Sequence, residues 1–321
     1  MTANNKSGWP PHCRAALARA LRLASRQFPR AGEDEATRVH DVRKTLKAAA
    51  GLARLFTDLV GAPAQATLTA INAARRKVGR ARDLDILPGV LAALDLPAES
   101  RDALTAAIAE QREAERRAHL DVDVGGLAAE LRALADSVEA WNVEAAGAAP
   151  LIAALRRSYR SARRRGDAAL PSGPPRELHA LRVRVVDLVY QLSVFESAWP
   201  AMMRAMMREL QRLRTALGDH NDLTVLAEFA AARAELTPEQ KVAVAVLIAK
   251  RRRPLARRAA QLYARLFAER PSAFERRLAA TIENPRRKPP AHRTSRAPRP
   301  VAAAGDDATP IAHDGGSAHI P

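Results

Sequence analysis

The sequence predicts an all-α protein in which two four-helix bundles, produced by an internal duplication, are related by a pseudo-two-fold axis around a basic cavity. Three observations support this fold class. Apolar residues recur at helical spacing through most of the 321 residues. Alanine, leucine and arginine dominate, so strand-forming stretches are nearly absent. The two halves also share paired motifs at one constant offset.

The periodicity predicts helices in two series. The first covers residues near 11–28, 34–60, 64–94, 98–120 and 125–145, and the second covers residues near 149–166, 175–198, 200–218, 222–235, 237–270 and 272–283. The breaks fall at Pro- or Gly-containing segments such as "GAPA", "ALPSGPP" and "LTPEQ". We therefore expect an N-terminal extension over 1–10, a helical domain over 11–283 with halves of about 11–148 and 149–283, and a disordered Pro/Arg/Gly-rich tail over 284–321.

A shift of 139 residues reveals the internal repeat. It places His40 on His179, Arg43 on Arg182 and Phe56 on Phe195. The same shift aligns "GRARDLDIL" (79–87) with "GDHNDLTVL" (218–226), so that Asp83 falls on Asp222. One offset shared by several residue types indicates a duplicated four-helix unit.

The charge of the chain points to an acidic partner. There are 52 Lys and Arg residues against 35 Asp and Glu, a net charge of +17, and 45 of these cations are arginines. Residues 284–321 hold six cations and three acids, so the expected fold keeps +14. Arginine binds phosphate well because its planar fork donates paired hydrogen bonds. Nucleic acid, anionic lipid and other polyanions are the partners that such a surface fits.

Other features exclude some classes of protein. Cys13 is the single cysteine, so an intramolecular disulfide is impossible. The N-terminal residues do not resemble a signal peptide. The longest apolar run, residues 242–249, has 8 residues, against the roughly 20 that span a bilayer. We expect a soluble, cytoplasmic protein without membrane insertion.

The stretch "VHDVRKTLK" (39–47) carries the most informative charge pattern. At about 100° per residue, one third of the helix surface holds a line of side chains over nearly four turns: His40, Arg43, Lys44, Lys47 and Arg54. Like charges at this spacing repel one another by a few tenths of a kcal/mol per pair. A solvated face would usually include glutamates to relieve this repulsion. The pattern therefore favours a surface that binds a polyanion.

Further cations are expected to extend this surface. The helix near 149–166 places Arg156, Arg160 and Arg163 on one face, and the segment "KRRRPLARR" (250–258) is also strongly basic. The helix near 64–94 is less ordered in this respect, because Arg75, Arg76, Lys77 and Arg80 spread around the cylinder. If the two bundles meet about the axis, these faces enclose a basic groove.

Catalytic and metal-binding patterns are missing from the sequence. There is no Walker-type loop, no G-x-S-x-G and no HExxH. His40 has only cations one helical turn away, which does not fit a metal site. Asp83 and Asp222 each follow a segment, containing Gly79 or Gly218, that we expect to form a turn, and we expect the two aspartates to cap the next helix or to pair with an arginine. We expect no enzyme activity, no cofactor and no metal.

With the histidine followed by cations at +3 and +7, then "RLF" and "GRARDLDIL", the chain resembles the conserved histidine α-helical domain (CHAD) family over about residues 11–283. The second half contributes "LHALRVRVVDLVY" and "ALGDHNDLTVL". The resemblance implies two helical bundles about a basic cavity, binding of inorganic polyphosphate, and association with polyphosphate granules. It also implies phosphate contacts from His40, Arg43, Lys47, His179, Arg182 and Arg184. The sequence departs from the family at Val186, Asp187 and Val189, where further cations are usual.

The sequence therefore predicts a non-enzymatic protein that binds polyphosphate in a basic central groove. Two alternatives stay open. A nucleic-acid-binding protein would use the same basic surface, although aromatic residues make up only 4% of the chain and none lies within the cationic stripe, which disfavours single strands. A histidine-dependent phosphotransfer or metal-binding protein would account for the histidines.

Overall fold

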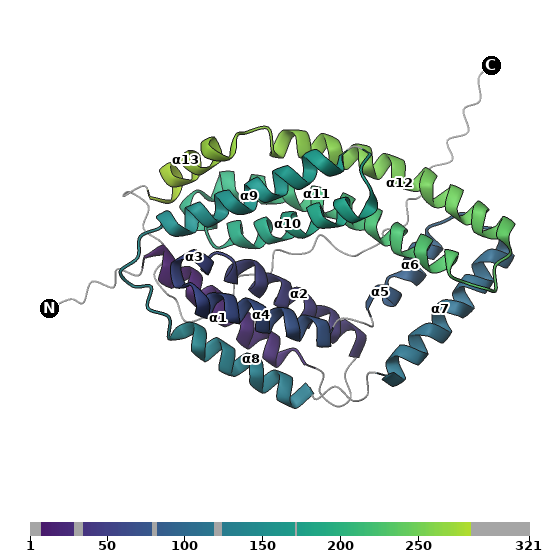
Figure 1. Cartoon of the computed structure of the whole chain (residues 1–321), viewed down its shortest axis with the longest axis horizontal. Coiled ribbons are helices and arrows are strands. Elements are labelled where there is room, and N and C mark those ends of the chain that lie inside the picture. Colours follow the sequence, from purple (N-terminus) through teal and green to yellow (C-terminus); the bar gives the residue numbers. More distant parts are fainter. Residues whose placement is uncertain (1–7, 29–34, 79–81, 119–123, 171, 284–321) are drawn as a thin grey trace, which may run out of the picture. The chain divides into compact units, whose positions relative to one another are not determined.

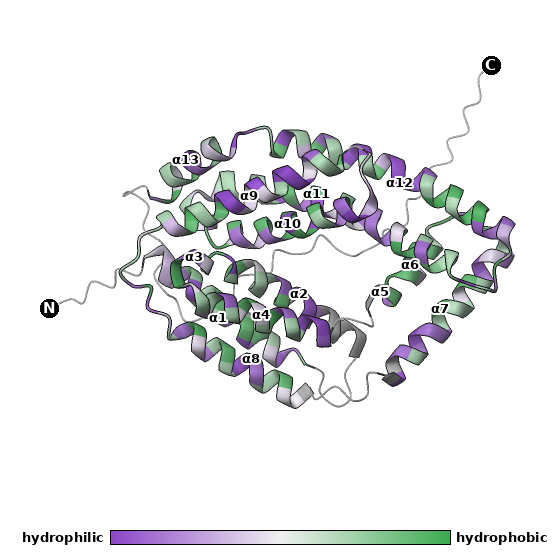
Figure 2. Ribbon diagram, viewed as in Figure 1, coloured by the Kyte–Doolittle hydropathy of each residue, from purple (hydrophilic) through white to green (hydrophobic). Residues whose placement is uncertain are grey.

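The computed structural model describes residues 8–28, 35–78, 82–118, 124–170 and 172–283, and this part of the chain contains helices and connections but no strand. The all-α class is thereby confirmed. Figure 2 shows hydrophobic and hydrophilic residues alternating along the helices, as amphipathic helices require. Within the described ranges, no helix is both long enough and apolar enough to cross a membrane.

The first group of helices packs as a ring of four (Figure 1). It consists of α1 (Trp9–Arg26), α2 (Glu35–Ala53), α4 (Ala62–Lys77) and α8 (Val124–Glu139), with the short α3 (Thr57–Val60) between α2 and α4. Helix α1 contacts α2 and α8, and α4 also contacts both of these. Leucines at helical spacing, such as Leu17 and Leu21, are fully buried between them. Each such side chain contributes about 1.5–3 kcal/mol by leaving water.

The second group contains α9 (Ala149–Ala169), α10 (Pro175–Ser193), α11 (Pro200–Ala231), α12 (Pro238–Leu266) and α13 (Pro271–Ile282), with a 3₁₀ turn, η1 (Glu196–Ala198), after α10. Helix α10 packs against α9 and α11, while α12 covers α11 and α13 covers α9. Every one of these five helices has proline in its first turn, where the missing N–H costs nothing. Thr237 and Gln240 close a capping box on α12.

A third set of helices, α5 (Arg82–Asp85), α6 (Leu87–Ala92) and α7 (Ala98–Ala118), has its own small core with α11 and α12. The single helix expected over 64–94 was therefore wrong. Helix α4 ends at Lys77, and Pro88 lies in the first turn of the separate helix α6. A proline inside a longer helix would break its hydrogen-bond ladder, whereas the first turn tolerates it.

The break expected near residues 218–222 was also wrong, because α11 runs without interruption from Pro200 to Ala231. Gly218 lies buried in its middle. A glycine costs a helix about 1 kcal/mol relative to alanine. The buried neighbours Leu217 and Leu223 offset that cost, because they pack into two different hydrophobic clusters.

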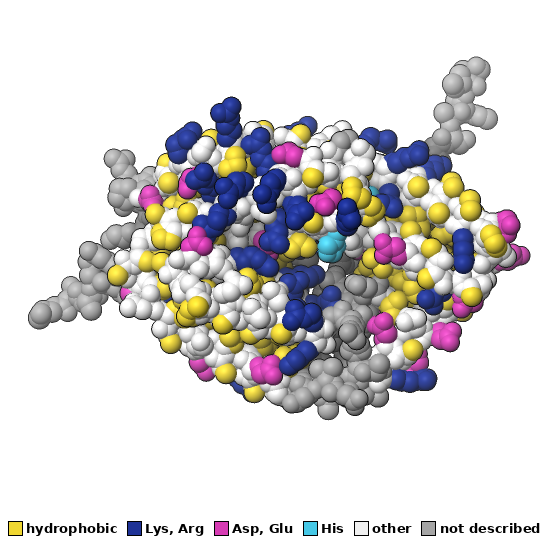
Figure 3. All heavy atoms as spheres, viewed as in Figure 1, with side chains coloured by type: hydrophobic (Ala, Val, Ile, Leu, Met, Phe, Trp, Pro, Cys, Tyr) yellow, Lys and Arg dark blue, Asp and Glu magenta, His cyan; other side chains and the backbone are white. Residues whose placement is uncertain are grey.

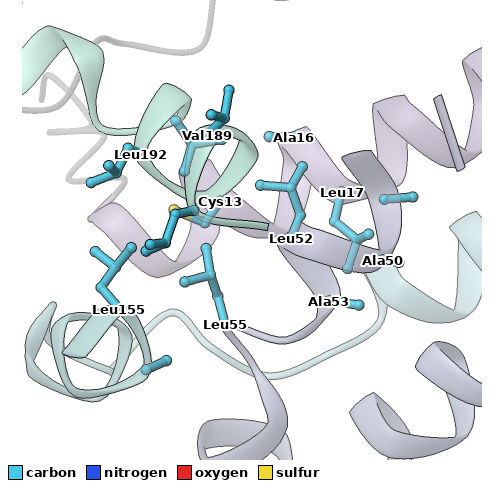
Figure 4. Packing of buried hydrophobic residues seen from close by; sticks show 14 of the residues in the cluster. Cys13, Ala16, Leu17, Ala50, Leu52, Ala53, Leu55, Leu155, Val189 and Leu192 are labelled. Carbon is cyan, nitrogen blue, oxygen red and sulfur yellow. The ribbon is translucent and has the colours of Figure 1, made fainter. Parts of the chain in front are cut away.

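The two groups meet where α2 crosses α10. The Gln191 side-chain amide donates a hydrogen bond to the Gly51 carbonyl, with 3.0 Å between Nε2 and O. A Cβ atom on Gly51 would lie 3.3 Å from Cβ of Tyr190, which explains why glycine occupies this position. Figure 4 shows Leu52 and Leu55 from the first group packed near Leu155 and Val189 from the second. One hydrophobic core therefore continues across the crossing.

The N-terminal residues Trp9 and Pro10, which we expected in an extension, form the first turn of α1. The Trp9 ring packs on Phe195 with 5.1 Å between ring centroids, and its Nε1 donates to the Ile282 carbonyl at 2.9 Å. Helix α1 thus connects both groups. The tail predicted over 284–321 lies outside the described residues.

Candidate functional site

The cations of α2 and its buried apolar residues lie on different sides of the helix, as the sequence predicts. Arg43, Lys44 and Lys47 are half-buried, while Val42 and Leu46 are fully buried on the opposite side of the helix. His40 belongs to α2, but its side chain lies outside the described residues. The apolar face anchors α2 to the first group, and the cationic residues on the other side keep part of their surface exposed.

On α10, His179 is exposed and is held by α11. Its Nδ1 lies 2.8 Å from Oδ1 of Asn221, and because an amide oxygen only accepts, Nδ1 carries the proton in this contact. Sequence reasoning did not single out Asn221. Asn221 lies in the segment "GDHNDL", but its contact with His179 depends on the packing of α10 against α11.

Arg182, one turn further along α10, crosses α11 at Gly218. A Cβ atom on Gly218 would lie 3.4 Å from Nε of Arg182. This is an ordinary van der Waals distance, so the guanidinium of Arg182 packs directly against α11 at this glycine. The turn expected at Gly218 is absent, because α11 is continuous there.

A buried carboxylate lies at the crossing of α2 and α10. Asp187, with a side chain 7% exposed, accepts from Nη1 of Arg54 at 3.0 Å through Oδ1, and from Nη1 of Arg184 at 3.2 Å through Oδ2. Burial raises the pKa of Asp187, and Arg54, Arg184 and Arg75 oppose this rise. Arg54 and Arg184, which we predicted to contact phosphate, are therefore held by Asp187. We had noted Asp187 only as a departure from the family.

The cations of α9 differ in their partners. Arg156 pairs with Glu275 of α13 at 2.9 Å, and Nη1 of Arg163 donates to the Glu269 carbonyl at 3.1 Å. Arg160 is exposed and has no ion-pair or hydrogen-bond partner among the residues described. The face predicted from the sequence is present, but only part of it is free to bind a ligand.

Asp222 does not cap a helix, because it lies inside α11. Nδ2 of the adjacent Asn221 lies 3.5 Å from Oδ1 of Asp222. The capping prediction was wrong for this residue, since the helix that it was to begin is continuous with the one before. Asp83 is the second residue of α5, and its side chain lies outside the described residues.

The basic segment 250–258 includes one arginine that points into the protein. Nε of Arg252 donates to Nε2 of His220 at 3.2 Å, between α12 and α11. Burial and the neighbouring Arg252 lower the pKa of His220 to about 4. His220 is therefore neutral at pH 7 and acts as a hydrogen-bond acceptor. The other cations of the segment are exposed: Lys250, Arg251, Arg253, Arg257 and Arg258.

Lysine and arginine side chains gather on one face of the molecule. Figure 3 shows them in a band that crosses α9 and α10 and continues over α2, with acidic side chains fewer inside the band than around it. These helices belong to different groups, so the band exists only in the folded protein. Its charge suits an anionic ligand that spans more than one helix.

The described part of the chain is all-helical and carries a cationic band over α2, α9 and α10. The chain belongs to the CHAD domain family, because the family model described as "CHAD domain" matches residues 15–231, more than half of the sequence. The match ends at Ala231, where α11 ends. Neither a curated protein nor a solved structure matches the chain.

Proposed function

We propose that this protein binds inorganic polyphosphate on the cationic band, without catalysing its turnover. The supporting observation is the stripe of Arg43, Lys44 and Lys47 on the solvent side of α2, in a chain of the CHAD family. Polyphosphate carries repeated negative charge and no bases. Guanidinium and ammonium groups without interleaved aromatic rings suit such a ligand.

We also propose that the band lines a groove between two related bundles. Gly51 and Tyr190, which the 139-residue shift equates, meet where α2 crosses α10. Phe56 and Phe195, equated by the same shift, are both fully buried just beyond the ends of these helices. Equivalent residues that meet at one crossing are expected on a two-fold axis. This symmetry would bring the two histidine-bearing helices to opposite sides of one ligand.

We propose that phosphate contacts come from residues of the cationic band, namely His40, Arg43, Lys44, Lys47, Arg160, His179 and Arg182. Arg156 pairs with Glu275 and Arg163 donates to the Glu269 carbonyl, and we expect these two arginines to add their positive charge. The histidines would donate hydrogen bonds to phosphate oxygens and need no metal for this role.

Competition between ligands tests the class of partner. Labelled long-chain polyphosphate is bound to the protein and challenged with duplex DNA at equal phosphate concentration and about 150 mM salt. We expect DNA to displace little of the label, because the groove fits a narrow chain. Efficient displacement by DNA would instead support the nucleic-acid alternative.

The same samples test the absence of catalysis. Incubation of the pure protein with polyphosphate, with and without added Mg²⁺, should leave the chain length unchanged on a gel. Release of orthophosphate would contradict a purely binding role. Association with polyphosphate granules would follow from such affinity, and fluorescence microscopy of the tagged protein in cells that accumulate granules would test it.

A further inference from the structure

Three arginines surround the carboxylate of Asp187. Arg54, which directly follows the end of α2, and Arg184 of α10 each donate to a different oxygen of this carboxylate. Arg75 of α4 is close enough for its charge to interact with both Asp187 and Arg54. One acidic group thus faces three cations, so the cluster keeps an excess of positive charge.

We propose that Asp187 is an internal counter-ion that withdraws Arg54 and Arg184 from the polyanion and thereby limits the affinity of the site. This inference rests on the proposed binding of polyphosphate. Each guanidinium donates one hydrogen bond to the carboxylate, and the same N–H groups are the donors with which arginine binds phosphate oxygens. The carboxylate therefore competes with a phosphate group for these donors.

Burial explains why the carboxylate and not the ligand holds these arginines. Asp187 is 7% exposed, whereas Arg54 and Arg184 are 21% and 35% exposed. A carboxylate that is already desolvated and attached to α10 is present at a high effective concentration. A polyphosphate chain must displace it, leaving a buried charge without its partners, and such a loss is costly.

The first test replaces Asp187 with asparagine, which has nearly the same shape. We expect Asp187→Asn to raise polyphosphate affinity about threefold to tenfold. The slope of log affinity against log salt concentration should also become steeper, by about one to two phosphates neutralised, because Arg54 and Arg184 join the ligand contacts. Unchanged or weaker binding by a variant with native circular dichroism would overturn the proposal.

Asp58→Asn is the matched control. Asp58 is a carboxylate with 58% of its side chain exposed, and it pairs with Arg157 of α9 at 2.5 Å. The substitution changes the net charge by the same amount and also releases one arginine. We expect a smaller gain in affinity, below about twofold. Equal gains in the two variants would show that net charge alone matters, which would overturn the role of Asp187.

A second pair of variants covers the case in which Asp187→Asn does not fold. Arg184→Gln removes a cation held by Asp187, and Arg160→Gln removes an exposed cation without a partner in the described part of the chain. Both lower the net charge by one. We expect Arg160→Gln to weaken polyphosphate binding at least threefold more than Arg184→Gln. Equal losses would mean that Arg184 contacts the ligand directly.

A third measurement separates this inference from the proposed function. Sulfate is titrated against Asp187→Asn, Asp58→Asn and the wild type, and the melting temperature is compared with that in NaCl of equal ionic strength. We expect sulfate to stabilise Asp187→Asn most, because the anion replaces the missing carboxylate. Equal stabilisation of all three would overturn the counter-ion role. A wild type that binds no polyphosphate would reject the proposed function and leave this result standing.

Discussion

The two histidines His179 and His220 differ in burial, and this difference gives them different hydrogen-bonding roles. His179 is exposed and is joined to Asn221, whereas His220 is 5% exposed and accepts a hydrogen bond from Arg252. A neutral His220 satisfies the partly buried guanidinium of Arg252. A protonated His220 would place two cations in contact. His220 therefore stabilises the contact of α11 with α12 only while it is neutral.

This pairing predicts a loss of stability in mild acid. The folded protein holds the pKa of His220 at about 4, below its ordinary value of 6.5. The unfolded chain therefore binds a proton before the folded chain does, and the free energy of unfolding falls as the pH drops from about 6.5 to about 4. We expect a contribution on the order of 2 kcal/mol. Urea denaturation at several pH values measures it.

His220→Gln provides the comparison, because glutamine also accepts a hydrogen bond but does not titrate. Carboxylates elsewhere titrate equally in both proteins, so their effect cancels. The stability difference between wild type and variant should shift in favour of the variant as the pH falls from 6.5 to 4. Parallel pH profiles would show that His220 does not carry this effect.

At the scale of the element, α9 and α12 approach closely at one glycine. A Cβ atom on Gly166 would lie 1.9 Å from a ring carbon of Tyr263. That ring cannot move freely, because its hydroxyl donates to Oδ1 of Asp167 at 2.6 Å and its face stacks on Phe267. The absence of a side chain at Gly166 therefore fixes the distance between the two helices.

We expect Gly166→Ala to destabilise the protein by about 1–3 kcal/mol through overpacking, although alanine is the better helix former by about 1 kcal/mol. Chemical denaturation measures the change. Gly89→Ala is the control, since nothing lies within 4 Å of its added methyl group; it should be neutral or slightly stabilising. When Gly166→Ala is introduced into a protein that already carries Tyr263→Ala, most of the destabilisation caused by overpacking should disappear. A stabilising Gly166→Ala would contradict this account.

The helices α2 and α10 should contribute unequally to binding. The repeat relates four cations of the first half, three on α2 and one directly after it, to four positions of α10. Arg43, Lys44, Lys47 and Arg54 correspond to Arg182, Val183, Val186 and Ser193. Val186 is buried. The second half therefore keeps one of the four cations.

Charge reversal measures this inequality. We expect the double variant Arg43→Glu, Lys47→Glu to lose at least about 100-fold in polyphosphate affinity, since each charge-assisted contact contributes about 1.5–3 kcal/mol. Arg182→Glu should lose less per reversed charge. Circular dichroism must show native helix content in each variant. Equal losses per charge from the two helices would reject the unequal model.

At the scale of the whole molecule, the net charge of +17 should make binding sensitive to salt. Each phosphate that is neutralised releases counterions, so log affinity falls linearly with log salt concentration. By analogy with nucleic acids, contact with four or more phosphates should reduce affinity about 100-fold or more between 50 and 200 mM salt. Titrations of labelled polyphosphate at several salt concentrations measure this slope. A flat response would mean that few phosphates are contacted.

Much of the fold could be predicted from the sequence, because helix formation depends on local patterns. The faces of α2 were predicted correctly, since the cations and the buried Val42 and Leu46 alternate at helical spacing. The starts of α10 to α13 follow the prolines. Gly218 was misinterpreted as part of a turn because a glycine alone does not show whether buried neighbours stabilise the helix around it.

Some features of the candidate site could likewise be predicted from the sequence, and others could not. The sequence by itself determined the helical class, the excess of arginine and the stripe on α2, because these depend on composition and on residues within a few turns of one another. Only the tertiary structure decided which cations have partners. Arg54 and Asp187 are 133 residues apart, and Arg252 and His220 are 32 residues apart. The pairing of such groups depends on how whole helices pack, so no local pattern encodes it.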